Sequence, residues 1–207
     1  MLPISMAGVN SKAWKRQKRD FETVAFEDLP YEIILKIFES VNIKDLFQCM
    51  AVSKKFKIIA NDQSLWNKMH LAGTATFPPE LISQIISRGC QYLSFYDCHI
   101  LKKNVRFEKN YQLKYFCILN CHEYDGNLEI QRDSFEIMPA FAGSCYSLEK
   151  LSIRCQIEEK KMEPQFFKCI IQNSDTLRVL ELTNFELSLE SVQRIFSLCQ
   201  ELTELKS

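Results

Sequence analysis

Two Cys-His pairs are the residues of this chain whose types could hold a metal ion. Cys98-His99 and Cys121-His122 stand at the same position of two similar segments, so the two cysteines are expected on neighbouring strands. Zinc requires four ligands in a tetrahedral arrangement. Packing of Cys98 and Cys121 beneath a turn explains both cysteines without a metal. We therefore expect no metal and no other cofactor.

Catalysis by a cysteine would require a histidine base and a group that orients this base. The sequence has 3 histidines, namely His70, His99 and His122, and none of them lies in a catalytic motif. It has no Gly-rich phosphate loop, no Gly-x-Ser-x-Gly and no paired catalytic carboxylates. Its 5 glycines are few for a nucleotide-binding enzyme. We expect a protein that is not an enzyme, and an enzyme that uses Cys and His is the alternative.

Composition limits the class of protein further. The 207 residues are 46% hydrophobic and 25% charged, which suits one or two compact domains. Lys+Arg and Asp+Glu both number 26, so the balance favours neither nucleic acid nor a membrane surface as partner. The longest uncharged run, residues 137–148, is too short to span a bilayer. The sequence has 9 cysteines and no visible signal peptide, so its cysteines are expected to be reduced thiols. We expect the protein in the nucleus, the cytoplasm or both.

Residues 1–25 have no apolar periodicity and contain a basic cluster. This cluster consists of Lys12, Lys15, Arg16, Lys18 and Arg19. A flexible, solvated tail is the prediction, and a nuclear-import signal is the alternative.

Residues 26–70 predict three short helices joined by tight turns. Apolar residues recur at helical spacing after Pro30, and Asn42 and Ser53 are expected to cap the second and third helices. Ile33, Ile34 and Ile37 cannot all face inward in so small a unit. At least part of this helix face should therefore contact a partner.

Residues 71–207 contain a recurring strand pattern, Leu-x-x-Leu-x-Leu, in which Cys or Phe can replace Leu. Copies begin at Cys90, Leu113, Leu148, Leu177 and Leu202, at intervals of 23 to 35 residues. Helical segments alternate with them over residues 78–86, 164–171 and 188–199, and a weaker one, interrupted by Pro139, over 134–145. Residues 100–112 are polar, and their pattern predicts neither a helix nor a strand. The pattern predicts a solenoid of about five repeats, the last one incomplete, with a short parallel sheet.

The stretch from Phe26 to Trp66 resembles an F-box. The resemblance rests on the residues Leu29-Pro30, Glu32, Ile33, Leu35, Ile37-Phe38, Leu46, Val52 to Phe56, Ile59-Ala60 and Ser64-Leu65-Trp66. Most F-boxes with this pattern have Cys and Trp where this chain has Ser53 and Phe56.

An F-box followed by these repeats is similar to an F-box/leucine-rich-repeat protein. The join from Trp66 to Gly73 resembles that of the S-phase kinase-associated protein two type of SCF substrate receptor, in which the first strand follows the F-box directly. The resemblance implies an α/β (α+β) fold, with three F-box helices followed by a horseshoe of repeats. It also implies a non-catalytic subunit of an SCF ubiquitin ligase. A repeat scaffold acting outside the ligase is the alternative function.

The resemblance implies two sets of partners. The F-box would bind the Skp adaptor, and through it the cullin and RING subunits, whereas the repeats would bind the protein to be ubiquitinated and degraded. The apolar candidates for contact with the adaptor are Leu29, Pro30, Ile33, Ile37, Phe38, Leu46, Val52 and Trp66. Some of them, Trp66 in particular, could instead pack the helices together.

The strand template also predicts a binding face. Its Leu positions enter the core, so the alternating residues face the concave side of the sheet. The candidates are Tyr92, Tyr96, Tyr115, Leu119, Lys150, Arg154 and Glu181. Aromatic anchors beside basic residues suit a protein segment, and a phosphorylated peptide is among the candidates. An ordinary solvated sheet face is the alternative.

Overall fold

The computed structural model describes residues 25–73, 76–101, 106–124, 137–154, 160–161 and 164–206. The basic cluster of residues 12–19 lies outside these residues. The chain forms two compact units, residues 1–60 and residues 61–207. The first unit thus ends at Ala60, before the expected boundary at residue 70, because the strand that follows Trp66 belongs to the sheet of the second unit. No helix of the described ranges has the length and apolarity needed to cross a bilayer.

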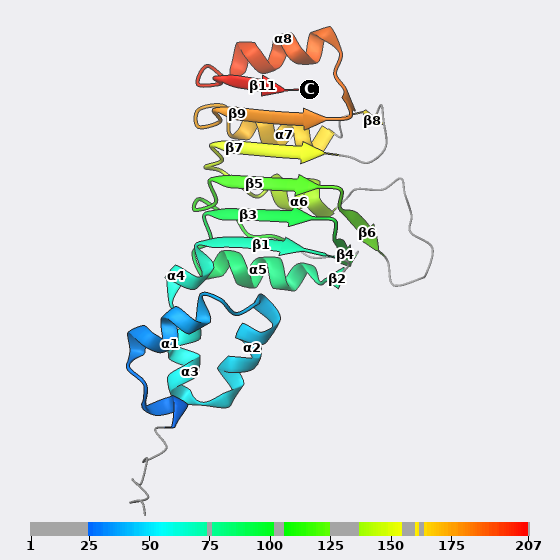
Figure 1. Cartoon of the computed structure of the whole chain (residues 1–207). Helices are drawn as coiled ribbons and strands as arrows, with labels where there is room; N and C mark the ends of the chain where they lie inside the picture. Colours follow the sequence, from blue (N-terminus) through cyan, green and yellow to red (C-terminus); the bar gives the residue numbers. More distant parts are fainter. Residues whose placement is uncertain are drawn as a thin grey trace, which may run out of the picture. The chain divides into compact units, whose positions relative to one another are not determined.

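The first unit contains the three expected helices. A 3-10 turn, η1 (Phe26–Asp28), precedes α1 (Tyr31–Phe38), α2 (Ile43–Val52) and α3 (Lys54–Ala60) (Figure 1). Both predicted caps are present, since the Asn42 side chain accepts a hydrogen bond from Asp45 N and Ser53 Oγ accepts one from Phe56 N. Pro30 precedes the first helical residue, so its missing N–H costs the helix no hydrogen bond.

The small core of the first unit consists of side chains from all three helices. Phe56 lies edge-on to Phe38 at 5.5 Å and to Phe26 at 5.3 Å. Ile34 and Ile59 are completely buried. This arrangement uses the inward side of α1, which leaves the opposite side of that helix outside the core.

The second unit is a mixed α/β structure built around a parallel sheet of six strands in chain order, β1-β3-β5-β7-β9-β11 (Figure 1). The strands are β1 (Lys68–Ala72), β3 (Tyr92–Tyr96), β5 (Tyr115–Leu119), β7 (Lys150–Arg154), β9 (Val179–Thr183) and β11 (Glu204–Lys206). Five of them begin inside the copies of the template. The template did not predict β1, in which Met69 and Leu71 are the buried residues.

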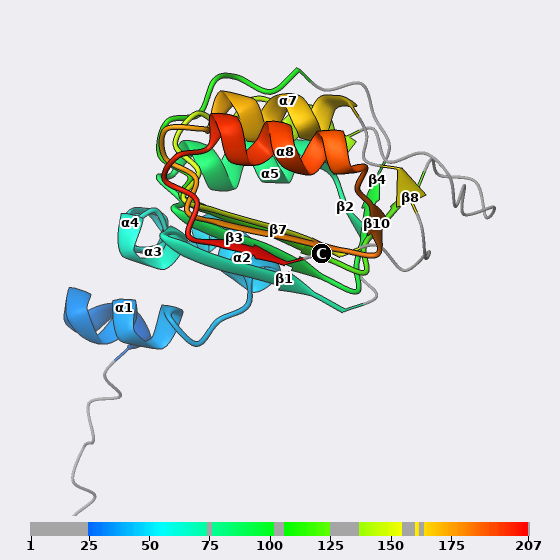
Figure 2. The same ribbon diagram turned by 90° about the horizontal axis from the view of Figure 1, so that it is seen from above.

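Helices cover one face of this sheet, and Figure 2 shows α5, α7 and α8 as a layer above it. The helices of the second unit are α4 (Gln63–Trp66), α5 (Pro79–Ser87), α6 (Ile137–Ala142), α7 (Pro164–Gln172) and α8 (Leu189–Leu198). The short strands β2 (Thr76–Phe77), β4 (His99–Leu101) and β6 (His122–Tyr124) form a second parallel sheet, and β8 (Lys160–Lys161) pairs with β10 (Phe185–Glu186). Between the sheet and the helices lies an apolar core that includes Phe95, Phe116 and Phe141.

The turns after three of the strands have the same backbone form. Asp97, Asn120 and Asn184 directly follow β3, β5 and β9, and their φ angles are 48°, 53° and 65°. Aspartate and asparagine tolerate this left-handed conformation better than other non-glycine residues. The chain can therefore turn sharply at each of these points with few glycines.

Asn173 connects two neighbouring strand–helix segments of the second unit. It directly follows α7, and its side chain is 2% exposed. Its Oδ1 accepts a hydrogen bond from Leu148 N at 2.8 Å, and its Nδ2 donates to Cys145 O at 2.9 Å and to Cys169 O at 2.8 Å. These bonds fix the end of α7 to the turn that precedes β7.

Candidate functional site

The exposed side of α1 is the first candidate surface. Ile33 is 49% exposed and Ile37 is 39% exposed, whereas Ile34 between them is buried. The expectation that the three isoleucines could not all face inward is therefore confirmed. Residues four positions apart lie on the same side of a helix, so Ile33 and Ile37 form one apolar ridge that water contacts in the free chain.

The other residues predicted to contact an adaptor divide into two groups. Leu29 is half-buried, and Pro30 and Val52 are exposed. Phe38 and Leu46 belong to the core of the first unit. Trp66 is completely buried in the second unit, where the Arg88 guanidinium lies 4.4 Å from the centroid of its ring. The buried residues support the fold and are not accessible to a partner in this conformation.

Lys55 positions the turn that carries Leu29. Its Nζ donates hydrogen bonds to Glu27 O and Leu29 O, each at 2.7 Å. A hydrogen bond that involves a charged group contributes about 1.5 to 3 kcal/mol. The turn is thus attached to α3 by one cation.

We expect the substitution Lys55→Met to release this turn while leaving the three helices in place. The backbone amides of Asp28 and Leu29, which donate to Ala25 O and Phe26 O, should exchange with solvent at least about tenfold faster. Hydrogen exchange measured by NMR checks this. Unchanged exchange at both amides would contradict the role assigned to Lys55.

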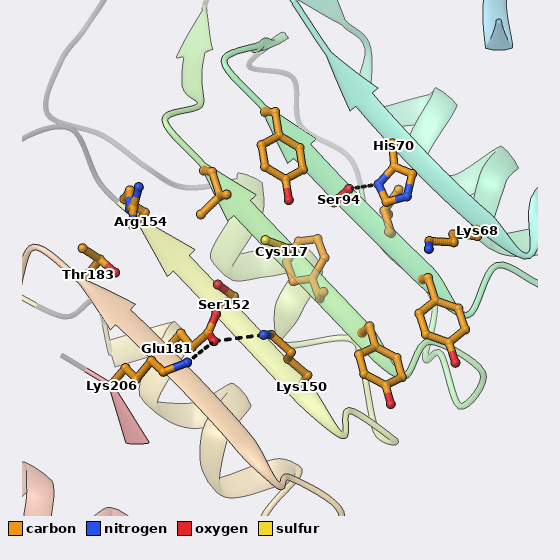
Figure 3. A pocket seen from close by; sticks show the side chains of 16 residues that line it. Lys68, His70, Ser94, Cys117, Lys150, Ser152, Arg154, Glu181, Thr183 and Lys206 are labelled. Carbon is orange, nitrogen blue, oxygen red and sulfur yellow. Dashed lines mark hydrogen bonds and ion pairs between the residues drawn. The ribbon is translucent and has the colours of Figure 1, made fainter. Parts of the chain in front are cut away.

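The uncovered face of the six-stranded sheet is the second candidate surface, and it holds a pocket of about 440 Å³ (Figure 3). Its lining includes the seven predicted substrate-binding residues, namely Tyr92, Tyr96, Tyr115, Leu119, Lys150, Arg154 and Glu181. Val179, which the strand template also assigns to this face, is not part of the lining. Sequence reasoning missed Lys68 and His70 of β1 and Lys206 of β11. The alternation of Met69 and Leu71 with polar residues was the signal that could have located β1.

The strand register arranges the pocket side chains in three rows across the sheet. The central row has small residues on β3, β5 and β7, namely Ser94, Cys117 and Ser152, and it ends at His70 on β1 and at Glu181 and Lys206 on β9 and β11. The tyrosine row on one side consists of Tyr92, Tyr115 and Lys150, and the arginine row on the other side consists of Tyr96, Leu119 and Arg154. Small side chains therefore lie between two rows of larger ones.

The pocket has an aromatic end and a charged end. The rings of Tyr92 and Tyr115 stack at 4.4 Å between centroids. His70 Nδ1 forms a hydrogen bond with Ser94 Oγ at 2.5 Å. At the other end, Glu181 accepts from Lys150 at 2.9 Å and from Lys206 at 3.2 Å (Figure 3).

The Glu181 carboxylate is held in its charged form. Burial alone would raise its pKa, but hydrogen bonds from Lys150, Ser152 and Lys206 outweigh this effect and lower the pKa to about 2. Because the ordinary pKa of glutamate is about 4.3, folding stabilises the carboxylate. The stabilisation is present above the ordinary pKa and is lost as the pH falls through the folded-state pKa.

We therefore expect Glu181→Gln to reduce the stability of the second unit at pH 7, and the difference from the unsubstituted chain to shrink between about pH 5 and pH 2. Urea denaturation at a series of pH values measures this difference. A difference that stays constant over that range would contradict the assigned ion pairs.

Cys98 and Cys121 occupy equivalent positions before β4 and β6. Their Sγ atoms are 3.4 Å apart, and both side chains are buried. The hydrogen bond between the two thiols raises the pKa of Cys98 and lowers that of Cys121. Across the described ranges, the structure has no group of three or more residues that could hold a metal ion.

Comparison with known proteins identifies the class of the first unit. Residues 26–72 match the family described as F-box-like. They include all three helices of the first unit and extend to the end of β1. The match supports an F-box protein whose F-box precedes a parallel sheet.

Three relatives are similar to part of the chain. Human F-box/WD repeat-containing protein 8 is 34% identical over 100 residues, which cover 45% of this chain and 16% of the human protein. The rat and mouse proteins of the same name are each 39% identical over 56 residues, 26% of this chain and 9% of theirs. The chain thus matches only a small part of these relatives. WD-repeat blades are sheets of an antiparallel all-β fold, whereas here parallel strands alternate with helices.

Proposed function

We propose that this chain is a substrate-recognition subunit of an SCF ubiquitin ligase. The observation that carries the proposal is the F-box-like match over residues 26–72, together with the exposed Ile33 and Ile37 on α1. An exposed apolar ridge on so small a helical unit suits a hydrophobic partner interface. The partner is the Skp adaptor, which connects the chain to cullin and to the RING subunit.

The adaptor surface in this proposal consists of Leu29, Pro30, Ile33, Ile37 and Val52, with Phe38 and Leu46 beneath it and Trp66 supporting the second unit. The chain itself supplies no catalytic residue. It acts in the nucleus, the cytoplasm or both, where the ligase and its substrates meet.

The second unit is, in this proposal, a short leucine-rich-repeat solenoid whose uncovered sheet face binds the protein to be degraded. Two features support the repeat type: the parallel strands follow one another in chain order, and the Leu-x-x-Leu-x-Leu template recurs at β3, β5, β7, β9 and β11. The pocket between the tyrosine row and the arginine row supports the location of the substrate site.

Co-expression with the Skp adaptor tests the proposal. A stable complex on size-exclusion chromatography is the expected result, and the complex should assemble further with cullin and the RING subunit. A chain that never co-purifies with the adaptor would instead be a repeat scaffold acting outside the ligase.

A further inference from the structure

The three rows of the pocket form a trench that crosses the strands. Neighbouring strands lie about 4.8 Å apart, and alternate residues of one parallel strand about 6.6 Å apart. The backbones of the tyrosine row and the arginine row are therefore about 13 Å apart, with the small central row between them. This width accommodates one extended peptide whose backbone runs across the strands.

The two ends of the trench differ in chemistry. Over β3 and β5, the walls are the stacked Tyr92 and Tyr115 on one side and Tyr96 and Leu119 on the other. These side chains suit a large apolar group. This end therefore resembles the anchor pocket of a protein interface.

The other end of the trench is cationic. Lys150 and Lys206 both pair with the carboxylate of Glu181, and Lys206 pairs with Glu204 as well, at 2.7 Å. Arg154 is exposed and has no ion-pair partner among the residues that the structure describes. The three cations thus face two carboxylates, Glu181 and Glu204, and the excess positive charge lies at Arg154. An anionic group beside Arg154 would complement this charge.

We propose, resting on the substrate-receptor function above, that this trench binds an extended segment in which a large apolar residue is followed two positions later by an anionic residue. The apolar side chain lies over the space between β3 and β5, and the anion lies over β7 on the Arg154 side of Ser152, away from the Glu181 carboxylate. These points are about 7 Å apart across the sheet, which is the length of two residues of extended chain. The volume of about 440 Å³ is in the range of specific ligand pockets.

Fluorescence anisotropy with the 207-residue chain and labelled peptides tests this inference. The peptides carry Leu-Gln-Xaa between Gly-Ser flanks, where Xaa is Asp, Glu, phosphoserine or Asn. We expect an anionic Xaa to bind at least about tenfold tighter than Asn, because Arg154 forms charge-assisted hydrogen bonds with it. Replacing Leu by Gly, or moving the anion next to Leu, should abolish this gain.

Arg154→Gln should remove the advantage of the anionic peptides, and Arg154→Lys should retain part of it. Lys168→Gln is the matched control, because Lys168 is an exposed cation on α7 and lies outside the pocket. Circular dichroism verifies the fold of each variant. Equal binding of Asp, Glu and phosphoserine identifies an acidic segment, whereas binding of phosphoserine alone identifies a phosphorylated one.

Either of two results would overturn the inference: the anionic peptides bind no better than the Asn peptide, or Arg154→Gln leaves their affinity unchanged. Co-purification with the Skp adaptor is measured on the same preparations. Failure of the peptide test with an intact adaptor complex rejects the trench alone. Loss of the adaptor complex with intact peptide selectivity rejects the ligase function alone.

Discussion

Replacing Ile33 by aspartate is expected to weaken binding of the chain to the Skp adaptor by at least about 30-fold. Ile33 is 49% exposed on the outer side of α1, and loss of a central apolar anchor costs about 2 kcal/mol or more. The aspartate adds the cost of a charge that must lose its water at the interface. Isothermal titration calorimetry with the purified adaptor measures the change.

Ile58→Asp is the matched control for this experiment. Ile58 lies on α3 and is 67% exposed, so its substitution places the same charge on another exposed position of the same unit. We expect this variant to retain affinity within about threefold. Equal losses for both variants would show that the effect comes from the fold or charge of the unit and not from the ridge on α1.

Replacing Asn173 by leucine is expected to reduce the free energy of unfolding of the second unit by about 3 kcal/mol. The Cys145 and Cys169 oxygens would retain other donors, from the Gln172 side chain and the Asn173 backbone. Leu148 N would lose the acceptor that it has in Asn173 Oδ1 and would remain buried. An unsatisfied buried donor costs about 1 to 3 kcal/mol, and the lost hydrogen bonds add to this.

Gln172→Ala provides the comparison, because Gln172 also donates to Cys145 O but Asn173 remains as a second donor to that oxygen. A loss below about 1.5 kcal/mol is expected for this variant. Urea denaturation followed by circular dichroism measures both variants. A loss in Asn173→Leu no larger than that in Gln172→Ala would contradict the connecting role of Asn173.

The sequence predicts much of the secondary structure because apolar spacing determines which side of an element is buried. The Asn42 and Ser53 caps, the partial exposure of the isoleucines on α1, and the alternation along β5 and β9 all follow from local patterns. The strand β1 lacked the full template, and it was expected only from the resemblance of the join after Trp66. Its residues Lys68 and His70 were therefore missing from the predicted face.

Long-range features could not be derived from local patterns. Trp66 fits an apolar interface by its position, but its burial beside Arg88 depends on packing in the second unit. The pairing of Glu181 with Lys150 and Lys206 depends on the register of three strands. The helix expected over residues 134–145 is shorter, Ile137–Ala142, and residues 134–136 lie outside the described part of the chain.

The chain-order pairing of the six strands also determines how much of the second unit a disrupting mutation affects. Each inner strand forms its ladder with the strand before it and the strand after it. Stability in such a linear array is close to a sum of nearest-neighbour terms. A disrupted β11 would leave the five preceding strands paired, whereas a disrupted β5 would divide the sheet and separate the tyrosines of β3 from the cations of β7 and β11. A mutation that disrupts a middle strand is therefore expected to destabilise the sheet most, and one that disrupts the edge strand β11 is expected to be tolerated best.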